Sequence, residues 1–91
     1  MNRLEESRKV INETDEQLVK LFEQRFAAVK QVLEYKKEHH LPVLDAAREA
    51  YLIEKRESEV SEELRPYFRT FYQALLASSR NYQSDHVKDP S

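Results

Sequence analysis

The chain of 91 residues is long enough for one domain, although a monomer of this size buries only a small core. It contains no glycine and no cysteine, which excludes glycine-rich phosphate loops, disulfides and zinc–thiolate sites. The formal net charge is −2 and no apolar run approaches the roughly 20 residues of a membrane span, so we expect no binding to nucleic acid or membrane. A cysteine-free chain without an apolar signal segment fits a cytoplasmic protein. Abundant Glu, Lys, Leu and Ala favour an all-α fold.

The first predicted element is one long amphipathic helix from about Leu4 to about Glu38, a stretch without helix breakers. Its apolar side chains recur on a seven-residue spacing in two registers, which is typical of a helix that packs lengthwise against another. The registers consist of Leu4, Ile11, Leu18 and Val32, and of Leu21, Ala28 and Tyr35. Arg25 stands where the first register calls for an apolar residue, so the seam contains a charge.

A loop follows over residues 39–44, because Pro42 disfavours helical backbone at the residue before it. Asp45 is a good N-cap for a second helix over about residues 46–60. The loop carries His40 close to the position where a glycine with positive φ often ends a helix. Since histidine tolerates a positive φ poorly, we expect that turn to be tighter or differently capped.

The segment 61–65 is predicted as a short turn, and Pro66 suits the first turn of a third helix that ends near Gln83. Its apolar stripe consists of Phe68, Phe71, Tyr72, Leu75, Leu76, Ser79 and Tyr82. The last eight residues have little to bury. We therefore predict one domain over residues 1–83 and a polar, disordered tail over residues 84–91.

The length of the first predicted helix implies a partner chain. About 35 residues at a rise of about 1.5 Å give a helix roughly 50 Å long. A compact chain of this length has a radius of gyration near ~12 Å, hence a diameter of roughly 30 Å. One end of the apolar seam would stay in water unless a second chain covered it. We therefore expect an obligate homodimer with paired long helices.

Three cationic side chains on this helix suggest where an anion binds. Arg25 and Lys36 are eleven residues apart, so they point within roughly 20° of each other at a separation of about 16 Å. Arg8 lies 17 residues before Arg25, which is roughly 25 Å along the axis and about 100° around it. Arg8 and Arg25 of one chain therefore cannot hold the same small ligand, whereas an antiparallel pair of helices can bring together Arg8 of one chain and Arg25 of the other.

Polar residues on the other two helices extend this pattern. Asp45, Arg48 and Glu49 lie at the start of the second helix, where free backbone N–H groups favour an anion. Ser79 and Gln83 are four residues apart and share the face of the apolar stripe. Each position has an ordinary interpretation as a cap, a surface charge or a register-fixing residue. Their joint placement favours a binding site. The histidines show no metal-ligand spacing, so no metal is expected.

In type and spacing, these residues resemble the all-helical chorismate mutases over about Leu4 to Gln83. The matching positions are Arg8, Asp15, Leu18, Leu21, Arg25, Lys36, Pro42, Val43, Asp45, Arg48, Glu49, Ser79 and Gln83. The segments Tyr35-Lys36 and Ser79-Arg80-Asn81-Tyr82-Gln83 are similar to those of the short, free-standing bacterial members. The resemblance implies an intertwined homodimeric bundle of three-helix chains. It also implies conversion of chorismate to prephenate by a Claisen rearrangement, toward phenylalanine and tyrosine, without cofactor or metal.

The resemblance also implies catalytic roles for three residues. Lys36 and Gln83 are expected to donate hydrogen bonds to the ether oxygen of the breaking bond, and Glu49 to bond the ring hydroxyl. The reaction is unimolecular and needs no nucleophile or base. The enzyme must hold a flexible dianion in a chair-like conformer and stabilise charge on the ether oxygen.

Substrate binding is implied for five further residues. Arg8 of the partner chain and Arg25 are expected to bind carboxylates of chorismate. The main chain near Asp45, together with Ser79, would hold the ring-side carboxylate, and Arg48 would support that end.

Two other functions remain open from the sequence. Isochorismate-pyruvate lyases share this scaffold, but the Arg48-Glu49 arrangement favours the mutase. A dimeric helical interaction module without enzyme activity would tolerate apolar residues at positions 25, 36 and 83.

The chain has no separate effector domain, so we expect unregulated activity. The sequence does not indicate whether another enzyme of the aromatic pathway docks on it.

Overall fold

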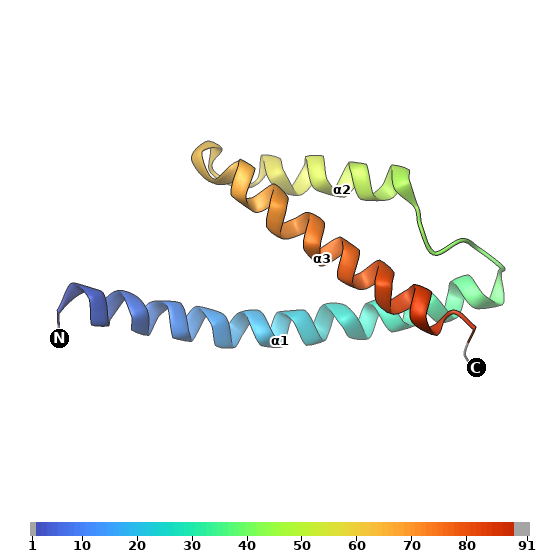
Figure 1. Ribbon diagram of the computed structural model, residues 1–91, viewed down its shortest axis with the longest axis horizontal. Helices are drawn as coiled ribbons and strands as arrows, with labels where there is room; N and C mark the ends of the chain where they lie inside the picture. Colours follow the sequence, from blue (N-terminus) through green and yellow to red (C-terminus); the bar gives the residue numbers. More distant parts are fainter. Residues whose placement is uncertain (1, 89–91) are drawn as a thin grey trace.

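The computed structural model describes residues 2–88 and is all-helical over that range (Figure 1). Helix α1 spans Arg3–Glu38, α2 spans Ala46–Ser58 and α3 spans Arg65–His86, with a short 3-10 helix, η1, at Glu62–Leu64. The predicted order of one long and two shorter helices is confirmed. The 36 residues of α1 give a length of about 54 Å, which matches the 55 Å long axis of the molecule. Within the described residues, no helix combines the length and apolarity needed to cross a membrane.

The end of α1 is closed by backbone hydrogen bonds around His40. The Leu41 N–H donates to the Lys36 carbonyl at 2.9 Å, and the His40 N–H donates to the Lys37 carbonyl at 3.4 Å. This is the Schellman arrangement, in which one residue takes a left-handed conformation. His40 takes it, with φ of 54°. The expectation of a different cap was therefore wrong, because histidine visits this region more readily than most residues that carry a Cβ.

The second helix begins at its predicted cap. Asp45 Oδ1 accepts a hydrogen bond at 3.0 Å from the backbone N–H three residues on. The helix ends at Ser58, two residues before the predicted end, and η1 fills part of the predicted turn. Arg65, the first residue of α3, donates from Nε to the Val60 carbonyl at 2.9 Å and from Nη2 to the Ser58 carbonyl at 3.4 Å. These bonds satisfy carbonyls that the end of α2 leaves open.

The third helix continues beyond its predicted end. Residues 84–86, assigned from the sequence to a disordered tail over residues 84–91, belong to α3, and residues 87–88 form a turn. The remainder of that predicted tail, residues 89–91, lies outside the described residues. Residues 84–88 contain no proline or glycine that would stop the helix. The rings of Tyr82 and His86, one turn apart, also pack with centroids 4.4 Å apart.

The core lies where α3 packs against both other helices (Figure 1). Its buried apolar side chains are Val29 and Leu33 of α1 with Tyr72 and Leu76 of α3. By contrast, every residue from 2 to 24 is exposed. The large apolar side chains of that half of α1 are 44–63% exposed, and they are Leu4, Val10, Ile11, Leu18, Val19, Leu21 and Phe22. Val32 and Tyr35, which belong to the predicted registers in the second half of α1, are also 46% and 56% exposed, so one chain leaves the predicted seam uncovered along its length.

Candidate active site

A cavity of about 280 Å³ lies between the three helices, and we call it the polar cavity. Seven of the eight sequence-predicted site residues line it, namely Arg25, Lys36, Asp45, Arg48, Glu49, Ser79 and Gln83. Apolar side chains close the rest of its wall, among them Val32, Leu52 and Leu76. Residues from all three helices and the loop before α2 thus converge on one space, as the sequence pattern predicted.

Two buried polar residues of α3 hold the cations of α1 in place. Arg25 Nη1 donates to Ser79 Oγ at 2.5 Å, and Ser79 Oγ donates in turn to the Leu75 carbonyl at 3.1 Å. Gln83 Oε1 accepts a hydrogen bond from Lys36 Nζ at 3.2 Å. Ser79 and Gln83 are 6% and 7% exposed, although such residues on a helix usually face solvent. Burial at this depth requires polar partners, and the arginine and lysine supply them.

The same bonds leave hydrogen-bond donors for a ligand. Lys36 Nζ has three N–H groups, of which one donates to the Val43 carbonyl at 2.7 Å and one to Gln83 Oε1. Gln83 Nε2 has two, of which one donates to the Ser79 carbonyl at 3.3 Å. Within the described residues, one ammonium N–H and one amide N–H therefore have no protein partner. Both belong to side chains that line the polar cavity.

The wall formed by α2 carries the carboxylates of the cavity. The Asp45 side chain is occupied as the helix cap. Glu49 forms an ion pair with Arg80 of α3, with Nη1 and Oε1 2.6 Å apart. Arg80 was not among the predicted site residues, because an arginine beside Ser79 resembles an ordinary surface charge. One signal in the sequence could have indicated Arg80. The apolar stripe of the third helix ends in the polar residues Ser79 and Gln83, and Arg80, which follows Ser79, lines the same cavity.

The charge of the cavity suits an anion. Among the described residues that line it, four side chains are cationic and two are carboxylates. The cations are Arg25, Lys36, Arg48 and Arg80. The surplus of two positive charges balances a dianion of small size. Arg48 is exposed and forms no ion pair in the described part of the chain, so its guanidinium is available to a ligand.

Arg8 is the one predicted site residue that does not reach the polar cavity. It lies in the exposed half of α1, about 25 Å along the helix from Arg25. Its side chain has no hydrogen bond or ion pair within residues 2–88. The geometry of one chain thus brings seven of the eight residues together and leaves the eighth in solvent.

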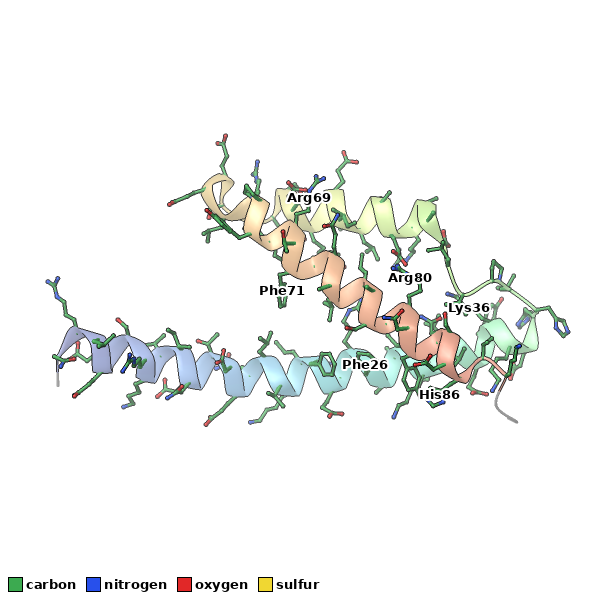
Figure 2. The ribbon with its side chains drawn as sticks, viewed as in Figure 1. Phe26, Lys36, Arg69, Phe71, Arg80 and His86 are labelled. Carbon is green, nitrogen blue, oxygen red and sulfur yellow. The ribbon has the colours of Figure 1, made fainter. Side chains whose placement is uncertain are left out.

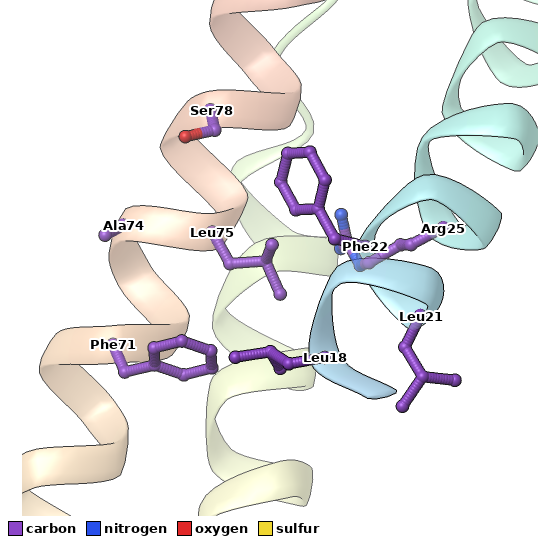
Figure 3. A pocket seen from close by; sticks show the side chains of 8 residues that line it. All are labelled: Leu18, Leu21, Phe22, Arg25, Phe71, Ala74, Leu75 and Ser78. Carbon is purple, nitrogen blue, oxygen red and sulfur yellow. The ribbon is translucent and has the colours of Figure 1, made fainter. Parts of the chain in front are cut away.

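A second cavity of about 330 Å³ lies beside the first, between α1 and α3, and we call it the apolar cavity (Figure 3). Phe71 and Leu75 of α3 face Leu18 and Phe22 of α1 across it, and Leu21 lines it as well. This lining does not suit a dianion, but it suits apolar side chains of another helix. Arg25 lines both cavities and so marks the border between them.

Comparison with known protein families identifies the chain. The family model of chorismate mutase type II matches residues 7–84, a range that includes all eight predicted site residues. Comparisons with curated proteins and with solved structures gave no significant match. The match spans most of the chain and agrees with its all-helical fold. The chain therefore belongs to the chorismate mutase type II family, whose members are isomerases that convert chorismate to prephenate.

Proposed function

We propose that this chorismate mutase works as an intertwined homodimer in which Arg8 of one chain completes the polar cavity of the other. The observation that carries the proposal is the separation of Arg8 from the seven residues that share the cavity. The exposed apolar seam of α1 supports it, because a second α1 laid antiparallel would cover residues such as Ile11 and Leu18. Absence of cysteine fits a reducing cytoplasm, where we propose that the reaction takes place.

Substrate binding follows from the charges. Chorismate carries two carboxylates, and we assign one of them to Arg25 and the partner's arginine at position 8. The ring-side carboxylate is assigned to Ser79, to the main chain near Asp45 and to Arg48. Holding both ends restrains the flexible ether chain in its chair-like reactive form. Restraint of this kind supplies part of the rate gain through orientation alone.

Catalysis is assigned to the two unpartnered donors of the polar cavity. Negative charge builds on the ether oxygen as its bond to the ring breaks, and Lys36 and Gln83 each have one N–H left for that oxygen. A millionfold acceleration needs roughly 8 kcal/mol. One preorganised donor to a developing oxyanion contributes about 2.7–4 kcal/mol, so two of them account for most of it. Glu49 has a carboxylate oxygen for the ring hydroxyl.

The cross-chain site is tested by mixing two inactive variants. Arg8→Ala and Arg25→Ala should each abolish most turnover, measured as loss of chorismate absorbance. After subunit exchange, half of the dimers are mixed, and each mixed dimer has one intact site. About a quarter of the unmodified activity should therefore return. Arg3→Ala, a change of the same kind at an exposed position of α1, should keep full activity.

Two results would count against this function. An unmodified chain that does not turn over chorismate at micromolar concentration would contradict the mutase activity itself. Normal turnover by the unmodified chain, with no recovery after exchange has been demonstrated by mass spectrometry, would show that Arg8 does not act across chains.

A further inference from the structure

Arg80 contacts one of the two carboxylates of the polar cavity, and it reaches that carboxylate from another helix. Its Nη1 donates to Glu49 Oε1 at 2.6 Å, from α3 to α2. Figure 2 shows the Arg80 side chain between these two helices. The side chains of Arg80 and Glu49 are only 33% and 24% exposed, and both line the cavity. The pair is therefore part of the wall that a substrate would touch.

We propose that Arg80 is a positioning residue for the mutase reaction. It fixes the Glu49 carboxylate through Oε1 and so presents Oε2 to the ring hydroxyl of chorismate. This inference rests on the proposed role of Glu49. Within residues 2–88, Oε2 has no hydrogen bond, so one carboxylate oxygen is held and the other is open. An ionised pair at this distance is a strong, directional hydrogen bond.

The need for such a restraint follows from the charges around Glu49. Arg48 is its neighbour on α2, and Lys36 lines the same cavity from α1. A glutamate with free side-chain torsions would be attracted to either cation. It would then neutralise a group needed for the substrate's carboxylate or ether oxygen. Arg80 removes this competition because it binds Glu49 from the α3 side.

A second ion pair between the same helices supplies a matched control. Arg69 of α3 donates from Nε to Glu57 Oε2 of α2 at 2.9 Å. Neither residue lines the polar cavity, and the Arg69 side chain is 53% exposed. If Arg80 only joined α2 to α3, substitutions of Arg80 and Arg69 should have similar consequences for catalysis.

The experiment measures kcat/KM for chorismate and for a chorismate analogue that lacks the ring hydroxyl. Arg80→Gln should lower the value for chorismate about tenfold, since a charge-assisted hydrogen bond orients the acceptor. It should leave the value for the analogue nearly unchanged. Arg80→Lys should recover part of the loss. Arg69→Gln should change neither value, and thermal melts of all variants check that each is folded.

A double-substitution comparison separates positioning from direct contact. In a Glu49→Gln background, Arg80→Gln should cost little more, because both changes remove the same interaction. A full additional loss in that background would mean that Arg80 binds the substrate itself, which overturns the inference. Equal losses for both substrates, or a gain of activity, would also overturn it. No turnover by the unmodified chain would instead reject the proposed function, and the inference with it.

Discussion

The predicted apolar registers run through both halves of α1, but only the second half also packs against α3 of its own chain. The half from Arg25 to Glu38 buries Val29 and Leu33 and supplies two cations to the polar cavity. The half before it, residues 3–24, buries no side chain within one chain. Helical periodicity therefore indicates which face of a helix seeks burial, while tertiary contacts decide which chain provides it. The buried Val29 and Leu33 lie outside the predicted registers, whose residues Val32 and Tyr35 stay 46% and 56% exposed. The proposed dimer would therefore cover a face of α1 that α3 leaves open.

A charge placed in the exposed half of α1 is expected to have the largest effect on dimerisation and activity. Ile11→Lys would bring lysines into the proposed interface in both chains, and burying an unpaired charge is costly. The variant should sediment as a monomer and lose nearly all mutase activity. Asn12→Lys adds the same charge outside both apolar registers and should remain a dimer. If Ile11→Lys sediments and turns over chorismate like the unmodified chain, then this half does not form the interface.

Truncation of one leucine in each half of α1 is expected to have a smaller effect. It compares how much each half contributes to the free energy of unfolding. Leu33 is 3% exposed, and Leu33→Ala should lower the free energy of unfolding by about 2–5 kcal/mol. Leu18 is 46% exposed in one chain. In a dimer that covers it, Leu18→Ala should approach the same loss, whereas in a monomer it should cost about 1 kcal/mol or less. Urea unfolding followed by circular dichroism measures both, and a near-neutral Leu18→Ala would argue against coverage by a partner.

The smallest effect on folding is expected at Arg25, where the halves meet. Arg25→Leu restores the apolar register and adds a side chain that suits the apolar cavity, so the melting temperature should stay the same or rise. Activity should fall at least about 100-fold, because a carboxylate of the substrate loses its charged partner. Thermal melts and kcat/KM of the same sample test this. A large drop in melting temperature together with full activity would assign Arg25 to structure alone.

Local signals in the sequence predicted most of the fold. Apolar spacing and breakers located the helices, and Asp45 was recognised as a cap because capping depends on residues close in sequence. The extension of α3 past Gln83 differs from the prediction, because the low apolar content of residues 84–91 indicates disorder, although nothing in residues 84–86 stops a helix. The left-handed His40 was missed for a similar reason, since glycine is the usual choice there.

The candidate site was predictable in part. Seven residues could be grouped because helical spacing places them on converging faces, and a family resemblance supplied their roles. The Arg80–Glu49 pair could not be predicted in this way, because it depends on how α3 crosses α2. Ion pairs between helices are set by tertiary geometry, which a single sequence does not display. Whether the site takes Arg8 from a second chain stays a prediction.

The closure at the end of α1 has a consequence for how a substrate enters. Lys36 binds the loop before α2 twice, with its carbonyl to the Leu41 N–H and with its ammonium to the Val43 carbonyl. A large opening of this loop would break both bonds and pull the ammonium away from the cavity, so loop motion is coupled to the position of Lys36. We expect that chorismate enters by the side opposite this loop, and that amide hydrogen exchange at Leu41 slows when the site is occupied.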